Sequence, residues 1–234
     1  AMIISHKHQF IFIKTEKTAG TSLEIALSKF CGPEDIITPI SDEDEITRQH
    51  RQFPGPQNYN YPNSFWLLRK RLLEGQKPQK FWNHIPASAV KRKVDETTWN
   101  SYFKFSVIRD PVERIVSFYY WAKNANQDVS DFPEFLRKYA SKIFRNYNIL
   151  TESDELTLDF HVCFERFEHD LSVVEKRLDM PESLYRVFND IKAKAGYRPH
   201  SSSSCDVIGD KERKIIRYIM RDEIQLLGYS QNDM

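Results

Sequence analysis

The sequence is poor in the residues and patterns that mark several specialised classes of protein. It holds seven glycines and three cysteines among 234 residues, which excludes collagen-like chains and disulfide-stapled scaffolds. No apolar run approaches the roughly 18 residues that a membrane-spanning helix needs, and no internal repeat is visible. The composition therefore indicates an ordinary globular domain with its own hydrophobic core.

The sequence also lacks an excess of charge of either sign. Lysine and arginine total 34 against 33 acidic residues, a net charge of +1, so no overall field attracts nucleic acid or anionic lipid. We expect neither a nucleic-acid partner nor a membrane partner, and any anion site must be built locally. Cys31, Cys163 and Cys205 are far apart in the chain and predict reduced thiols. No signal peptide precedes the first strand pattern, so we predict a cytoplasmic protein.

What the sequence does contain is an alternation of strand and helix patterns. Short β-rich apolar runs occur at Phe10–Ile13 and Phe103–Ile108, and a weaker run occurs at Phe160–Phe167. Segments with helical spacing separate these runs. The alternation predicts a single α/β domain over residues 1–234, with three layers and a mainly parallel central sheet.

Residues 33–80 form a stretch without this alternation. An acidic run at Asp42–Glu45 and turns rich in proline and asparagine predict an exposed loop, with one short helix at Phe65–Leu73. We interpret the stretch as an insertion over one end of the sheet. It holds aromatic and basic side chains that can contact a ligand, with local packing and a solvated surface as the ordinary alternatives. These side chains are Tyr59, Tyr61, Phe65, Trp66, Arg48, Arg51, Arg69, Lys70 and Arg71.

The segment Lys17-Thr18-Ala19-Gly20-Thr21-Ser22 has the composition of an anion-binding loop. It joins the strand at Phe10–Ile13 to a helical pattern that begins at Leu23. Backbone amides at the start of a helix attract negative charge, and this loop adds three hydroxyl groups, a flexible glycine and the ammonium of Lys17. The residues alone leave open a plain strand-to-helix turn in which a threonine or a serine caps the helix.

This loop differs from the Walker A motif of ATP- and GTP-binding proteins. That motif needs two glycines with the lysine after the second, whereas Lys17 precedes Gly20, the loop's one glycine. A carboxylate that would complete a magnesium site is also hard to find, because Asp110 lies before Pro111 and is explained by turn chemistry. We therefore predict no metal site. A group with less charge than a phosphoryl, such as a sulfuryl, can be transferred without a metal.

A second candidate anion site follows the strand at Phe103–Ile108. Arg109 ends this strand, and Ser117 comes eight residues later, about two turns into a helix that begins at Pro111. An arginine with a hydroxyl group suits a phosphate, although Arg109 can instead pair with a neighbouring carboxylate. Two anion sites at the ends of two strands suggest a nucleoside with phosphates at both ends, bound beyond the carboxyl edge of the sheet.

These segments resemble the PAPS-dependent sulfotransferases, where PAPS is 3′-phosphoadenosine 5′-phosphosulfate. The resemblance is strongest to the carbohydrate-type branch, which includes the heparan sulfate 2-O-sulfotransferases and bacterial relatives. Residues 10–30 resemble the family's 5′-phosphosulfate loop, and residues 105–117 resemble its 3′-phosphate strand and helix. Residues 83–87 resemble the segment with a candidate base. Residues 198–201 and 224–229 resemble the C-terminal cofactor loop and last helix.

The resemblance implies a P-loop-like fold and a role for each candidate residue. A hydroxyl or amine of the acceptor attacks the sulfur of PAPS in line, and adenosine 3′,5′-bisphosphate leaves. Lys17 would stabilise the leaving oxygen, and the loop as far as Ser22 would hold the 5′-phosphate. Arg109 and Ser117 would bind the 3′-phosphate, with Arg198 added from the C-terminal loop.

The same resemblance implies that a histidine takes the proton of the acceptor. His84 lies in the matching segment, and an imidazole with the ordinary pKa of about 6.5 suits this task. A histidine among apolar residues is, without the resemblance, more often structural. His50 in the insertion is the alternative base. The acceptor is expected to be a small molecule or a carbohydrate.

Two other functions are consistent with the residues. A small-molecule kinase, or another enzyme that handles nucleotide phosphates, would depend on Mg²⁺ and bind ATP. A nucleotide- or glycan-binding module without catalysis would bind the bisphosphate tightly and turn over no acceptor.

Overall fold

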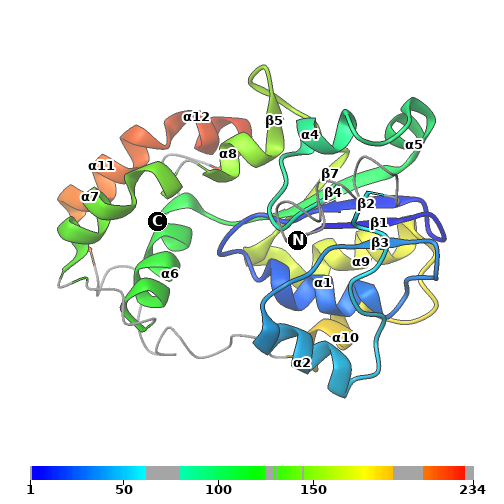
Figure 1. Cartoon of the computed structure of the whole chain (residues 1–234). Helices are drawn as coiled ribbons and strands as arrows, with labels where there is room; N and C mark the ends of the chain where they lie inside the picture. Colours follow the sequence, from blue (N-terminus) through cyan, green and yellow to red (C-terminus); the bar gives the residue numbers. More distant parts are fainter. Residues whose placement is uncertain are drawn as a thin grey trace, which may run out of the picture.

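We describe a computed structural model of the chain for residues 2–61, 80–124, 129, 131–143, 145–191 and 208–229, drawn in Figure 1. Its centre is a five-stranded sheet. The strands are β1 (Met2–Ser5), β2 (Phe10–Ile13), β3 (Ile36–Ile37), β4 (Phe103–Ile108) and β7 (Phe160–Cys163). Their order across the sheet is β3-β1-β2-β4-β7. Strands β2, β4 and β7 pair in parallel, and β1 is antiparallel to both β2 and β3. All strands except β1 therefore run in one direction, which confirms an α/β fold with a mostly parallel sheet.

Helices connect and surround these strands. They are α1 (Gly20–Ser28), α2 (Asp42–His50), α4 (Ala87–Lys91), α5 (Glu96–Ser101), α6 (Pro111–Asn124), α7 (Phe132–Ile143), α8 (Arg145–Leu150), α9 (Phe167–Arg177), α10 (Leu184–Asn189), α11 (Asp210–Ile219) and α12 (Arg221–Leu226). A short 3₁₀ turn, η1 (Phe164–Arg166), follows β7, and β5 (Thr151–Glu152) forms a small hairpin with β6 (Glu155–Leu156). Within the described residues no helix combines the length and the apolar character needed to cross a membrane.

The side chains of β2 alternate between two hydrophobic cores. Phe10 and Phe12 are buried with α1, α9 and α10 on one face of the sheet. Ile11 and Ile13 are buried on the other face with residues of α4, α5 and α8. This period of two is what a strand covered on both faces requires. The sheet thus forms the middle of three layers, as predicted.

A third core extends the molecule beyond the sheet. It joins α6, α7, α11 and α12, which group together at the left of Figure 1. Arg114 of α6 and Glu223 of α12 form a buried ion pair in this region, with Nη2 3.0 Å from each carboxylate oxygen. The same guanidinium donates to the carbonyl of Ile143 at the end of α7 at 3.1 Å. One arginine thus ties three helices together.

The structure corrects two sequence-based expectations. The weak run at Phe160–Phe167 is a strand only to Cys163 and then turns into η1. The acidic run at Asp42–Glu45, expected in an exposed loop, forms the first turn of α2. Carboxylates there interact favourably with the positive end of the helix dipole. Asp44 is also buried, and it accepts a 2.5 Å hydrogen bond from Ser41 Oγ.

Arg48 of α2 is neither a solvated cation nor an available acceptor contact. Its side chain is fully buried and pairs with Glu24 of α1 and with Glu45. The helix expected at Phe65–Leu73 lies outside the described residues, together with Arg69, Lys70 and Arg71.

Candidate active site

The candidate residues gather at the carboxyl edge of the sheet. Ile13, the last residue of β2, pairs with Ser106 of β4, and Ile108 pairs with Cys163 of β7. Because these strands are parallel, the segments that follow them leave the sheet at the same edge. The loop after β2, the turn after β4 and η1 after β7 are therefore neighbours.

Hydrogen bonds from two sides hold the loop that follows β2. Thr15 Oγ1 donates to the carbonyl of Val107 at 2.5 Å and lies 2.8 Å from Thr18 Oγ1. Asn146 of α8 accepts from the amide of Glu16 at 2.8 Å and donates to its carbonyl at 3.0 Å. Thr18 is fully buried, so its hydroxyl group helps to hold the loop in place. Thr21 and Ser22 follow in the first turn of α1.

The start of α1 has the geometry of an anion cradle. Lys17 and Ala19 both have positive φ, 61° and 59°, and Ala19 is the N-cap. Alanine has no side-chain acceptor with which to cap the helix, and the first turn of α1 holds no acidic residue. The alternative of a threonine or serine cap is therefore wrong. Amides at such a helix start, with the dipole behind them, favour a bound anion.

Gly20 is needed at this place because the chain comes close to it. A Cβ atom at position 20 would lie 2.9 Å from Cγ of Lys14 and 3.4 Å from the carbonyl oxygen of Thr15. A larger residue would thus push the helix start away from the strand that leads into it.

Lys17 lies beside the face of α6 that carries Ser117. The ammonium of Lys17 lies 4.9 Å from the ring centroid of Trp121 in α6. Trp121 comes four residues after Ser117, and residues with this spacing lie on the same face of a helix. Ser117 is half-buried on that face. The loop after β2 therefore contacts α6 at Trp121, on the face that also carries Ser117.

Arg109, which follows β4, packs against the ring of Phe164, which follows the neighbouring strand β7. Its guanidinium lies 4.4 Å from the ring centroid of Phe164 in η1, and Nη2 is 3.7 Å from Oε2 of Glu113. Its side chain is only 13% exposed. The pairing with Glu113, which the sequence left open, is long, with 3.7 Å between the two atoms. A bound phosphate can compete with it.

Asp110 has the structural role that its place before Pro111 predicted. Its Oδ1 accepts from the amide of Glu113 at 3.0 Å at the start of α6. Its own amide donates to Glu165 at 2.9 Å, and Arg217 of α11 lies 3.8 Å from its Oδ2. Arg217 was missed by sequence reasoning because a single arginine on a distant helix gives no spacing signal.

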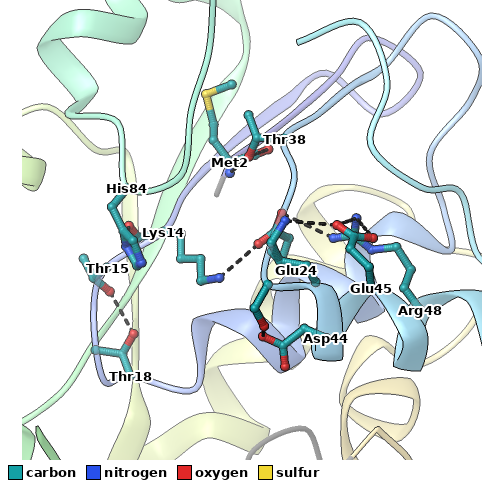
Figure 2. Close-up of polar contacts among 12 residues, drawn as sticks. Met2, Lys14, Thr15, Thr18, Glu24, Thr38, Asp44, Glu45, Arg48 and His84 are labelled. Atoms are coloured by element: carbon teal, nitrogen blue, oxygen red, sulfur yellow. Dashed lines mark hydrogen bonds and ion pairs between the residues drawn. The ribbon is translucent and has the colours of Figure 1, made fainter. Parts of the chain in front are cut away.

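His84 lies beside the loop after β2 (Figure 2), in a turn with φ of 56°. Its Nδ1 is 3.2 Å from the carbonyl oxygen of Lys14. A carbonyl only accepts, so Nδ1 carries the hydrogen and Nε2 keeps a lone pair for an acceptor proton. Burial, with the charge of Lys14 adding to it, lowers the pKa of His84 to about 2. The expectation of an ordinary pKa is therefore wrong.

His50 is not brought to this edge. His50 is exposed at the end of α2, and the next residue, Arg51, donates to the carbonyl of Asp190 after α10. Arg198 lies outside the described residues. Within the described part of the chain, no three histidine, cysteine or acidic side chains group as metal ligands. Cys31 and Cys163 are free thiols, and Cys205 lies outside this part.

Comparison with known proteins gives two matches. A family model described as "Sulfotransferase family" matches residues 1–230. An uncharacterized protein from Archaeoglobus fulgidus is 26% identical over 104 residues, which cover 43% of this chain and 87% of that protein. The first match spans the loop after β2, His84 and the segment from Arg109 to Ser117. The second covers less than half of the chain and names no function.

Proposed function

Because the chain belongs to the sulfotransferase family, we propose that it transfers a sulfuryl group from PAPS to a hydroxyl or amine of an acceptor. The observation that carries this proposal is the meeting of three elements at one edge of the sheet. These are the cradle at the start of α1, Arg109 with Ser117 after β4, and the neutral imidazole of His84. A P-loop-like arrangement of the fold is part of the same proposal.

The first cradle is proposed to hold the 5′ end of the donor. The amides after Ala19 and the hydroxyls of Thr21 and Ser22 would contact the 5′-phosphate. The ammonium of Lys17 lies over Trp121, and its long side chain can reach the oxygen that bridges phosphorus and sulfur. The positive end of α1 favours the negative charge of this group.

The second cradle is proposed to hold the 3′-phosphate. Arg109 can donate from a guanidinium that Phe164 already orients, and Ser117 adds a hydroxyl from α6. Such charge-assisted bonds distinguish a 3′-phosphate from a hydroxyl at the same place. Arg198 remains a proposed third contact from the C-terminal loop.

In the proposed reaction the acceptor oxygen or nitrogen forms a bond to sulfur while the bond from sulfur to the bridging oxygen breaks. The electron pair of that bond stays on the oxygen, where Lys17 stabilises the growing negative charge. The acceptor proton passes to Nε2 of His84. The low pKa of His84 keeps the ring neutral before binding, and the negative charge of a bound donor raises the pKa toward a useful value.

The acceptor is proposed to be a small molecule or a carbohydrate. A carbohydrate fits the resemblance to the carbohydrate-type branch. The insertion at residues 33–80 is proposed to form part of the acceptor side, where Tyr61 is 39% exposed and Trp82, just after the insertion, is 36% exposed.

The experiment that tests this function is a transfer assay with ³⁵S-labelled PAPS against a panel of sugars, phenols, alcohols and amines. Label should move to at least one class of acceptor, with activity intact in EDTA. Lys17→Ala should lower kcat by about 10²–10³, whereas Lys29→Ala, at the opposite end of α1, should leave it unchanged. Strict dependence on Mg²⁺ with ATP as donor would favour a kinase instead. Tight binding of the bisphosphate without transfer would favour a binding module.

A further inference from the structure

A buried lysine lies directly behind the candidate site. Lys14 follows the last residue of β2 and is 4% exposed. Its ammonium lies 3.2 Å from Oε2 of Glu24, a fully buried residue of α1. Figure 2 shows this side chain reaching from the strand end to the helix. Lysine is almost never buried without a partner, and Glu24 is the partner of Lys14.

The pair is the first link of a longer chain of charges. Oε1 of Glu24 lies 3.4 Å from Nη2 of Arg48, and Nη1 of Arg48 donates to both oxygens of Glu45 at 3.0 Å (Figure 2). Removing four charged groups from water is costly, and buried ion pairs of this kind often give little net stability. What they do give is a fixed geometry among β2, α1 and α2.

Lys14 also touches both halves of the candidate site. Its Cγ lies so close to Gly20 that a Cβ there would be 2.9 Å away, which sets the distance between the strand end and the start of α1. Its carbonyl oxygen accepts the hydrogen bond from Nδ1 of His84, which sets the tautomer and direction of the imidazole. One residue therefore contacts the donor cradle with its side chain and the base with its backbone.

We propose that Lys14 is a positioning residue that holds the donor cradle and the imidazole of His84 in a fixed relative arrangement. Its ammonium, anchored by Glu24, keeps the stem of the side chain against Gly20. The same anchor keeps the carbonyl of Lys14 pointed at His84. The inference rests on the proposed sulfuryl transfer, because it assigns these two groups to donor and acceptor.

The test compares two buried lysines of the same sheet. Lys14→Met keeps the length and apolar stem of the side chain and removes its charge. Lys104→Met is the matched control, because Lys104 is 7% exposed and pairs with Asp159 at 2.8 Å. Lys104 belongs to the opposite edge of the sheet, where its ammonium donates to the carbonyls of Trp99 and Tyr102. Both variants lose a buried ammonium, but of the two residues only Lys14 contacts the candidate site.

Two measurements separate positioning from simple loss of stability. Calorimetric titration with adenosine 3′,5′-bisphosphate should show affinity weakened by roughly 3–30-fold in Lys14→Met and unchanged in Lys104→Met. Long-range ¹H–¹⁵N spectra should show His84 protonated at Nδ1 in the wild type and in Lys104→Met. In Lys14→Met the two tautomers should be mixed. A folded Lys14→Met with wild-type affinity and a wild-type tautomer would overturn the inference.

A second variant covers the case in which Lys14→Met does not fold. Lys14→Met/Glu24→Gln removes both charges of the pair and leaves Arg48 with Glu45, so no carboxylate is left without a cation. It should show the same weaker binding and mixed tautomers. If neither variant folds, Lys14 is a determinant of the fold and the positioning role is overturned. If the wild type itself does not bind the bisphosphate, the proposed function fails, while the tautomer spectra still decide whether Lys14 orients His84.

Discussion

At the scale of single residues, Arg109 is the residue proposed to bind the 3′-phosphate. We predict that the wild type binds adenosine 3′,5′-bisphosphate more tightly than AMP. Arg109→Ala should erase this difference, a loss of about 1.5–3 kcal/mol for a hydrogen bond to a charged group. Thermal shift and calorimetric titration with both ligands give the comparison.

The matched control for Arg109 is Arg177 at the end of α9. Arg177 also lies over a phenylalanine, with its guanidinium 5.8 Å from the ring centroid of Phe103, but Phe103 begins β4 and so belongs to the opposite edge of the sheet. Arg177→Ala should retain the preference for the bisphosphate. Equal affinity of the wild type for AMP and the bisphosphate would remove Arg109 from the proposed site.

His84 gives a prediction about stability and pH. Burial lowers its pKa to about 2, so between pH 6.5 and 5 the unfolded chain binds a proton at this residue and the folded protein does not. The free energy of unfolding that the neutral imidazole contributes is therefore present above about pH 6.5 and decreases as the pH falls below that value. The contribution is at most about 1.4 kcal/mol per pH unit, or about 2 kcal/mol by pH 5.

His84→Asn should remove this contribution and give a flatter dependence of stability on pH, measured by urea unfolding from pH 5 to 8. Asparagine is the suitable substitution because it tolerates the positive φ of this turn. His50→Asn, on the exposed end of α2, should keep the wild-type slope. A wild-type slope in His84→Asn would show that the imidazole is charged in the folded protein.

Part of the site could be predicted from single residues and part could not. Arg109 comes directly after β4, and Lys17 lies in the short loop that follows β2, so recognising the two strands was enough to bring these two residues to one edge. Phe164, Asn146 and Arg217 also shape this edge. They come from distant segments, and nothing in their local sequence shows which strand end they will meet.

At the scale of elements, the start of α1 depends on the absence of a side chain at position 20. Gly20→Ala would place a Cβ 2.9 Å from Cγ of Lys14 and 3.4 Å from the carbonyl of Thr15. Lys14 is buried and anchored, so it cannot move aside freely. We predict a loss of about 1–3 kcal/mol in unfolding free energy and weaker binding of the bisphosphate.

Gly55→Ala is the control for this prediction, because a Cβ at position 55 would have no atom within 4 Å. That substitution should be neutral, or stabilise the protein slightly by restricting the unfolded chain. Melting temperatures of both variants, with and without bisphosphate, measure the difference. If Gly20→Ala binds and melts as the wild type does, the close approach at the start of α1 is not required.

The sequence predicted strands β2 and β4 of the sheet, but it did not predict helix α2. Strands β2 and β4 have nearly continuous apolar residues, which a sheet covered on both faces requires. Helix α2 has no such signal, because the residues it buries are Asp44 and Arg48. A helix that packs through an ion pair cannot be found by the spacing of its apolar residues, so its acidic start was interpreted as a loop.

At the scale of the whole molecule, Arg114 and Glu223 join the helices beyond the sheet. Each side chain is 4% exposed. Arg114→Leu would leave the carboxylate of Glu223 buried without its cation, and we predict a loss of about 3–5 kcal/mol in unfolding free energy. Arg114→Leu/Glu223→Leu should recover most of this loss, because no buried charge remains. Urea unfolding of both variants measures the two values, and a double variant no more stable than the single one would contradict the argument.

The contact between Lys17 and Trp121 has a practical consequence for following the protein in solution. The ammonium lies 4.9 Å from the indole ring, and the emission of an indole responds to a charge held so close to it. A ligand that draws Lys17 toward its own phosphate removes that charge from Trp121. The fluorescence of Trp121 should therefore change when such a ligand binds, and no added label is needed. Comparison with Trp121→Phe identifies the part of the emission that comes from Trp121.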